Sequence, residues 1–365
     1  MASLYSEKNL SDVMQELKAL PFNPRPLGGR MSTLLGFIPD ALPMLLDTKK
    51  KSACWLYPYP RSFKSITFPS LDGTTLAGKL ALHDDRRARP GLVFCHGIFG
   101  SKNQNYIRSV ALKAFRDWDY NVLALDTRGF GESQRLSDAQ MTGCWKESED
   151  IIGAAKTLGS YPEVTTVGVC GYSLGAGAAM IAASKDGGEF ITGGVMAWNG
   201  LADQKRMIEY IDKFPMPWQP FYFNYPVFKA CLILKLREAG GGYAHLHRFK
   251  EAFAHTCSNE YCLPEEEVLR FGSPKNYVAE IKIPTVHVHA EDDPVIPVRE
   301  AEENRAVARD NPDFDVWILK RGGHIMFPMV DKVWYHQVLQ GFFGAWALRE
   351  SSDYSHVPLE RTGIL

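Results

Sequence analysis

The sequence has almost no excess charge of either sign and no long apolar run. Its 365 residues carry 41 Lys and Arg against 42 Asp and Glu, so nothing in the total charge indicates a nucleic acid or an anionic membrane as partner. The longest apolar tract near the N-terminus, Met31–Leu46, is interrupted by Pro39, Asp40 and Pro43 and is shorter than the ~20 residues of a spanning helix. It could touch a membrane surface, but docking onto the protein's own body is favoured.

Signs of secretion are also missing. Residues 1–18 mix acidic, basic and apolar side chains without the apolar core of a cleavable signal. The seven cysteines are scattered and odd in number, and two of them fall inside predicted buried strands. That pattern is typical of free thiols in a reducing compartment, so we expect a cytoplasmic protein.

Metal-binding patterns are incomplete. Cys257 and Cys262 are the closest cysteine pair, but no second pair or suitably spaced histidines complete a zinc site. Two His-x-His triplets, at 245–247 and 287–289, place two rings on one face of a strand, with no third ligand in view. We therefore expect neither a metal ion nor a cofactor.

What the sequence does have is a regular succession of strands and helices. Hydrophobic residues make up 45% of the chain, enough for a large core in one or two domains. The Asp72-Gly73 pair predicts a hairpin between the first two strands. Apolar runs typical of strands occur at 65–70, 75–82, 91–96, 121–126, 165–173, 191–199, 284–291 and 314–320. Helix-length amphipathic segments separate most of them, notably 105–118, 145–158, 299–310 and 333–349. This pattern predicts an α/β fold with a mostly parallel, doubly wound sheet.

Reactive side chains follow several of these strands. In open parallel sheets, functional groups gather at the carboxyl ends of the strands. The residues just past the predicted strand ends are His96-Gly97-Ile98, Asp126, Ser173, Asp293 and His324. A nucleophile, an acid and a base are thus expected at one edge of the sheet.

Ser173 lies in the stretch VGVCGYSLGAGAAM, where an apolar strand changes into a helix. A serine between two glycines can simply form a tight turn. However, a sharp strand-to-helix turn forces strained backbone angles and close packing, which Gly171 and Gly175 permit because they lack a Cβ. The helix that begins near Leu174 directs its free N–H groups at the serine oxygen. We interpret Ser173 as an exposed nucleophile.

The acid and the base are less distinctive in isolation. In AEDDPVIP, either Asp292 or Asp293 could be the acid, and an aspartate there could merely cap the helix that follows. Asp293 is preferred because the Pro-Val-Ile-Pro behind it would fix the loop. His324 follows two glycines, where a histidine is often only a surface residue. The order Ser, Asp, His, each at a strand end, favours a triad. Asp126 and Arg128 in DTRGFGES are interpreted as a structural pair.

These motifs resemble those of the α/β-hydrolases over about Pro21 to Arg349. The similarity rests on CHGIFGS, LALDTRGFGES, GYSLGA, AEDDPVIP and GGHIMF, which stand in the family's order. More narrowly, the chain resembles the carboxylesterase group that includes plant embryogenesis-associated hydrolases and animal medium-chain acyl and phospholipid esterases. That similarity rests on FNPRPLGGRMSTLLGFIP, ITFPSLDGTTLAG and SPKNYVAEIKIPTVHVHAEDDP.

The resemblance implies a role for each site residue. Ser173 is the nucleophile, His324 the general base and then acid, and Asp293 the group that orients and stabilises the imidazolium. The backbone N–H groups of Ile98 and Leu174 form the oxyanion hole. These parts fit the chemistry, because a serine hydroxyl needs a base and a tetrahedral oxyanion needs preorganised donors.

The resemblance also implies an inserted cap. We expect an N-terminal extension at 1–60, an α/β-hydrolase core at 61–199 and 275–350, a cap or lid at 200–274 and a tail at 351–365. The segment FPMPWQPFYFNYPVF, residues 214–228, is dense in aromatics and proline. These side chains could line an apolar acyl pocket or form the core of the cap.

The sequence therefore predicts a serine hydrolase that cleaves carboxylic esters with an apolar acyl or alcohol part through an acyl-enzyme. The expected partner is a small-molecule ester. An acyltransferase with the same triad is the nearest alternative, and a cofactor-free lyase or a non-catalytic binding scaffold is the alternative of another class. Haloalkane dehalogenase and epoxide hydrolase chemistry is disfavoured, because both need a carboxylate in place of Ser173.

Overall fold

The computed structural model has one eight-stranded sheet at its centre, with the strand order β1-β2-β4-β3-β5-β6-β7-β8. β1 and β2 form an antiparallel pair, β2 pairs antiparallel with β4, and the remaining neighbours run parallel. This confirms the predicted mostly parallel sheet. The strands are β1 (Lys64–Pro69), β2 (Thr75–Ala81), β3 (Arg89–Cys95), β4 (Asn121–Asp126), β5 (Val164–Tyr172), β6 (Val195–Trp198), β7 (Thr285–Ala290) and β8 (Phe314–Leu319). The structure describes residues 9–26, 28, 31–33, 35–36, 57–85, 87–98, 100–212 and 260–348.

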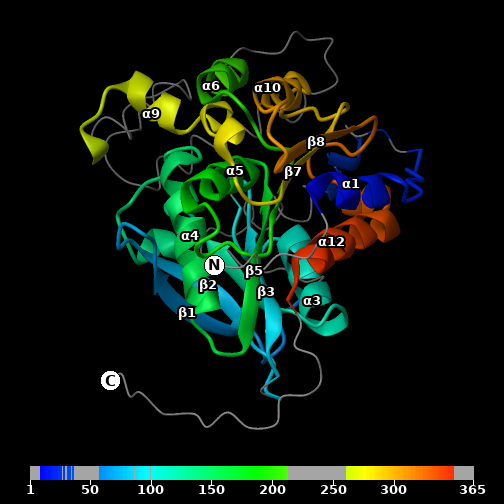
Figure 1. The fold of residues 1–365 in the computed structure, drawn as a ribbon. Helices are drawn as coiled ribbons and strands as arrows, with labels where there is room; N and C mark the ends of the chain where they lie inside the picture. The colour runs from blue at the N-terminus through cyan, green and yellow to red at the C-terminus, as the bar shows by residue number, and fades with distance from the viewer. Residues whose placement is uncertain are drawn as a thin grey trace.

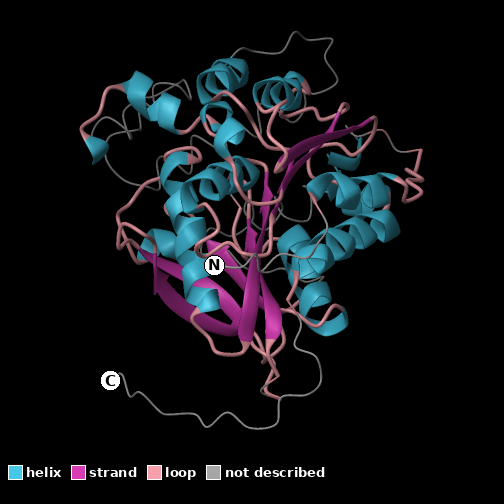
Figure 2. Cartoon of the chain, viewed as in Figure 1, coloured by secondary structure: helices cyan, strands magenta, loops and turns pink. Residues whose placement is uncertain are grey.

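Helices cover both faces of the sheet, as Figures 1 and 2 show. Every residue of β3, β4, β6 and β7 is buried, which explains why these strands are continuous apolar runs. One large apolar core includes side chains of α4 and α5, and a second includes side chains of α3 and α12. The covering helices are α3 (Asn105–Asp117), α4 (Trp145–Gly159), α5 (Leu174–Asp186), α10 (Arg299–Val307) and α12 (Lys332–Trp346).

Most predicted boundaries lie within a few residues of the observed ones, but the strand expected at 191–199 is shorter. β6 covers only Val195–Trp198. Gly194 has a φ of +79°, and a Cβ on Gly193 would lie 2.8 Å from the backbone nitrogen of Gly168. The chain therefore enters the sheet through a tight glycine turn pressed against β5, which an apolar pattern alone does not reveal.

The described N-terminal helix packs beside β8, the strand at one edge of the sheet. Helix α1 (Leu10–Lys18) starts at Asn9, whose side chain accepts a hydrogen bond from the Asp12 N–H at 2.9 Å. Its buried apolar face contacts α12 and β8 (Figure 1). Lys18 forms a 2.6 Å ion pair with Asp315 of β8. α1 therefore belongs to the same apolar core as α12.

The described ends of the stretch between β6 and β7, which is the predicted cap, lie on one side of the molecule. Helices α6 (Gln204–Asp212) and α9 (Glu265–Phe271) contact each other and share that side with α10 (Figure 1). A third apolar cluster joins them to the core through Phe130 and Met141. The aromatic segment at 214–228 and the His-x-His triplet at 245–247 lie outside the described residues.

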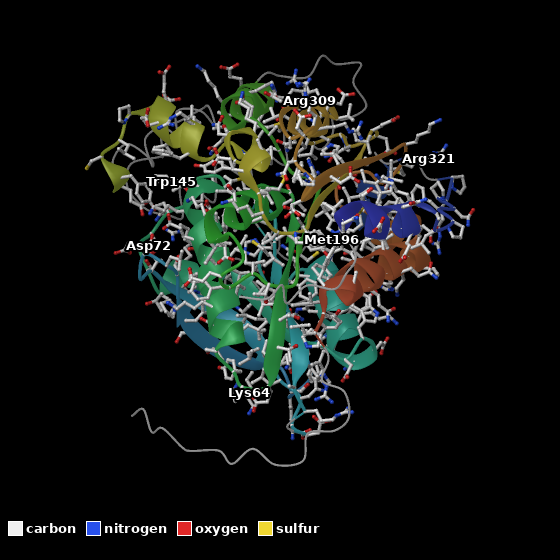
Figure 3. The ribbon with its side chains drawn as sticks, in the orientation of Figure 1. Lys64, Asp72, Trp145, Met196, Arg309 and Arg321 are labelled. Atoms are coloured by element: carbon white, nitrogen blue, oxygen red, sulfur yellow. The ribbon has the colours of Figure 1, made fainter. Side chains whose placement is uncertain are left out.

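The surface and interior differ as expected for a globular protein. In Figure 3, Met196 of β6 lies within the molecule, whereas Arg309 and Arg321 lie at its exterior. Cys95, Cys144 and Cys170 are buried free thiols, and Cys262 is an exposed one. Among the described helices, none combines the length and the apolar character needed to cross a membrane.

Asp126 and Arg128 are both structural, but they do not form a pair with each other as predicted. Buried Asp126 binds the ammonium group of buried Lys102 and accepts the Glu132 N–H at 2.8 Å. Arg128 instead binds buried Asp150 through two nitrogens, at 2.6 and 3.0 Å. Side chains two residues apart in a turn can point to different neighbours, so closeness in sequence did not predict the ion pairs of these two residues.

The hydrogen bonds of Arg128 also reach the segment before α9. The guanidinium lies 2.8 Å from Asp72 Oδ2 and 3.3 Å from the hydroxyl of Tyr261. Burial acts to lower the pKa of Arg128, but the Asp150 and Asp72 carboxylates outweigh it and raise that pKa above its usual value. Arg128 thus connects the β1–β2 hairpin, α4 and the segment before α9.

Replacing Arg128 by methionine should lower the free energy of unfolding by about 3–5 kcal/mol, because it leaves the buried Asp150 carboxylate without its counter-charge. Urea unfolding followed by circular dichroism measures this change. Exposed Arg135 offers a matched control, and Arg135→Met should alter stability by no more than about 0.5 kcal/mol. Equal stability of the two variants would mean that the network contributes nothing.

Candidate active site

Ser173 lies at the sharp turn between β5, which ends at Tyr172, and α5, which begins at Leu174. Its backbone has φ 56° and ψ -117°, a conformation that non-glycine residues rarely adopt. A Cβ on Gly171 would lie 2.2 Å from the Gly175 carbonyl oxygen, and a Cβ on Gly175 would lie 2.4 Å from the His96 carbonyl oxygen. Both glycines are therefore required by close backbone approach, as predicted for such a turn. The expectation of an exposed serine was wrong, because Ser173 is only 5% exposed.

His324 lies in the loop between β8 and the short helix α11 (Phe327–Val330). Its Nε2 is 2.9 Å from Ser173 Oγ, and its Nδ1 is 2.9 Å from Asp293 Oδ2. A carboxylate only accepts hydrogen bonds, so Nδ1 carries the proton and Nε2 presents a lone pair to the serine hydroxyl. The structure thus joins the three residues in one hydrogen-bonded chain.

The two candidate acids have different surroundings. Asp293 faces the imidazole with Oδ2, and its Oδ1 accepts the N–H groups of Val295 and Ile296 at 2.7 and 3.0 Å. Asp292 Oδ1 instead accepts the Gly323 N–H at 2.8 Å. Asp293 is therefore the carboxylate that contacts the histidine, and Asp292 supports the loop that carries it.

Two further residues hold this loop, and sequence reasoning missed both. The Thr33 hydroxyl accepts the His324 N–H at 2.9 Å, so the N-terminal region reaches the site directly. Asn199 donates to Asp293 Oδ2 at 2.7 Å. Asn199 is the last residue of the strand predicted at 191–199. This position was an available signal, because functional groups were expected at the carboxyl ends of the strands. For Thr33, no motif in the sequence marks a contact across 291 residues.

The segment His96-Gly97-Ile98 passes directly beside the serine. A Cβ on Gly97 would lie 3.0 Å from Ser173 Cβ and 3.5 Å from its Oγ. The buried His96 ring fixes this segment, because Nδ1 donates to the Gly97 carbonyl at 2.7 Å and Nε2 accepts the Thr127 N–H at 3.2 Å. Ile98 thus directly follows a backbone segment that is held against Ser173. Leu174, the next residue after Ser173, is the first residue of helix α5.

The remaining histidines near the site are held inside the core. His287 and His289 of β7 are fully buried, and burial lowers the pKa of both rings. His289 Nε2 donates to the Ile296 carbonyl at 3.0 Å, and His287 Nε2 accepts the Gly200 N–H at 3.2 Å. In the described part of the chain, no group of three or more His, Cys, Asp or Glu side chains could hold a metal ion.

The arrangement has the parts needed for acyl transfer. A hydroxyl lies within hydrogen-bond distance of an imidazole, and the imidazole is oriented by a carboxylate that accepts four hydrogen bonds. Such a chain can remove the serine proton as the oxygen attacks a carbonyl and return a proton to the leaving group. The N-terminal end of α5 adds a favourable field for developing negative charge.

A comparison with protein families agrees with this architecture. The model of the alpha/beta hydrolase family matches residues 92–335, which is more than half of the chain and includes the serine, the aspartate and the histidine. The chain belongs to this family. The predicted α/β-hydrolase fold and the resemblance at the level of the superfamily are thereby confirmed.

Solved structures of an esterase, a hydrolase and a peptidase match over most of the chain. The esterase Pf2001 of Pyrococcus furiosus has a TM-score of 0.56 and 20% identity, with 78% of this chain and 92% of that chain covered. A 2,6-dihydroxy-pseudo-oxynicotine hydrolase has a TM-score of 0.57 and 13% identity, with 91% and 85% covered. The acylaminoacyl peptidase of Pyrococcus horikoshii has a TM-score of 0.52 and 15% identity, with 81% of this chain and 44% of that chain covered. At these identities the similarity concerns the fold.

Proposed function

We propose that this α/β-hydrolase is a serine esterase that cleaves carboxylic esters with an apolar acyl or alcohol part through an acyl-enzyme. The observation that carries the proposal is the hydrogen-bonded chain from Ser173 Oγ through His324 to Asp293, with both contacts of the imidazole at 2.9 Å. Ser173 attacks the ester carbonyl while His324 takes its proton. Asp293 keeps the ring in the required tautomer and stabilises the imidazolium that forms.

The oxyanion formed in this step would be held by the backbone N–H groups of Leu174 and Ile98. Support comes from the close approach of Gly97 to Ser173, which brings the Ile98 segment next to the nucleophile. Each such donor contributes roughly 3–4 kcal/mol to transition-state stabilisation. His324 then protonates the departing alcohol, and a water activated by the same ring hydrolyses the acyl-enzyme.

The apolar character of the substrate is supported by the surroundings of Ile98. This half-buried side chain packs against the apolar cluster that includes Phe130 of the core and Ile208 of α6. Val268 and Leu269 of α9 belong to the same cluster. We propose that the stretch between β6 and β7 acts as a cap, because its described ends bring apolar side chains to Ile98, one of the two proposed oxyanion donors.

A series of p-nitrophenyl esters with acyl chains of increasing length tests both parts of the proposal. We expect hydrolysis of the esters, with kcat/KM rising by up to about fourfold for each added methylene until the pocket is filled, since each buried methylene contributes about 0.8 kcal/mol. Absence of hydrolysis across the series would contradict the esterase. A preference for acetate over every longer chain would contradict only the apolar pocket.

A further inference from the structure

Asn199 occupies a demanding position next to the triad. It follows β6 directly, is fully buried and has a φ of +52°. Its backbone N–H donates to the Val288 carbonyl of β7 at 2.8 Å, and the preceding Trp198 carbonyl accepts the Ser173 N–H at 2.9 Å. The backbone around Asn199 is therefore joined to the strand that precedes the acid and to the nucleophile turn.

The side-chain amide of Asn199 contacts both the acid and the base loop. Nδ2 donates to Asp293 Oδ2 at 2.7 Å and to the Gly323 carbonyl at 3.2 Å, and Oδ1 accepts the Ile325 N–H at 3.4 Å. These contacts use both donors of the amide and its oxygen. Two of them bind the backbone of Gly323 and Ile325, the residues immediately before and after His324. One side chain thereby fixes the distance between the carboxylate and the imidazole.

We propose that Asn199 is a positioning residue of this esterase, which holds the carboxylate of Asp293 and the imidazole of His324 in register. The inference rests on the proposed function of the triad. Asn199 donates to the same oxygen, Oδ2, that accepts His324 Nδ1. It therefore draws charge from that oxygen and moderates its attraction for a protonated imidazole.

Two other ionisable groups face the pair formed by Asp293 and His324. Asp292 comes from the same loop as Asp293 and binds the Gly323 N–H. His289 of β7 lies close enough to interact electrostatically with both Asp293 and His324, and burial lowers its pKa. Without the Asn199 amide, Oδ2 becomes a stronger partner for the imidazolium. The His324 ring then stays protonated to higher pH, where it cannot act as a base.

Asn199→Gly is the sharpest variant, because glycine accepts the positive φ while the amide is removed together with its Cβ. We expect kcat for p-nitrophenyl esters to fall about 10²-fold with KM nearly unchanged, since a displacement of about 1 Å in a catalytic group has an effect of this size. The acidic limb of the kcat/KM profile should move to higher pH.

Asn304 provides the matched control. It is also fully buried, and its amide donates to the Leu201 carbonyl at 3.2 Å and lies 3.3 Å from His287 Nδ1. Asn304→Ala should lower stability towards urea while leaving kcat and the acidic limb in place. A loss of kcat in both variants without any movement of the limb would overturn the positioning role and leave Asn199 as part of the framework.

Titration of the histidine rings by NMR separates this inference from the proposed function. It needs no substrate, so it decides the role of Asn199 even if wild type hydrolyses no ester. We expect the His324 ring signal, assigned with His324→Gln, to titrate at higher pH in Asn199→Gly than in wild type or Asn304→Ala. The same titration in all three proteins would refute the inference, while ester hydrolysis by wild type would still support the esterase.

Discussion

Replacing Ser173 by alanine should lower kcat for ester hydrolysis by roughly 10⁶-fold, the loss that follows when the nucleophile of a serine triad is removed. The fold should persist, because alanine is smaller than serine and fits the same turn. Steady-state kinetics on the best p-nitrophenyl ester measures the loss, and far-ultraviolet circular dichroism verifies the fold. Only the background rate of the ester should remain.

Ser160→Ala is a suitable control for this experiment. Ser160 is an exposed serine at the end of α4, where its hydroxyl donates to the Thr157 carbonyl at 2.7 Å. Its replacement should leave kcat and KM unchanged. Wild-type activity in Ser173→Ala would show that another residue is the nucleophile and that the turn between β5 and α5 has only a structural role.

Replacing Asp293 by asparagine should lower kcat by up to about 10⁴-fold, because an amide that donates to Nδ1 stabilises the wrong imidazole tautomer. The neighbouring Asp292→Asn should have a small effect. Its remaining oxygen can still accept the Gly323 N–H, a contact that Asp292 makes in the structure. Comparing kcat of the two variants on the same ester measures the difference.

The motif AEDDPVIP allows either aspartate to be the acid, so the two variants test the choice of Asp293 that the geometry supports. The reverse ranking would transfer the role of the acid to Asp292. Small and equal losses would remove both carboxylates from the mechanism. In either case, the 2.9 Å contact between Asp293 and His324 would have to be interpreted as structural.

The location of the site at the carboxyl ends of the strands was predictable because most of the sheet is parallel. Buried strands read as continuous apolar runs, and the carboxyl ends of such strands meet at one edge. Ser173, Asp293 and His324 come together for this reason, although 151 residues separate the serine from the histidine. The glycines around Ser173 were also readable, since the turn leaves no room for a Cβ.

Other features depend on side-chain directions that a linear pattern does not contain. Asp292 and Asp293 are adjacent in sequence, yet one contacts a backbone amide and the other the imidazole. Asp126 and Arg128 diverge to Lys102 and Asp150 for the same reason. The contact of Thr33 with the His324 loop depends on how the N-terminal region docks, which no local periodicity encodes.

Covalent labelling with a fluorophosphonate, followed by peptide mapping by mass spectrometry, tests the central claim most directly. The probe reacts readily with a serine that a neighbouring base has activated. The account predicts one stoichiometric adduct on Ser173 in wild type, no adduct in Ser173→Ala, and strongly slowed labelling in His324→Gln. A wild-type protein that remains unlabelled, or that carries the adduct on another residue, would contradict the assignment of Ser173 as the nucleophile.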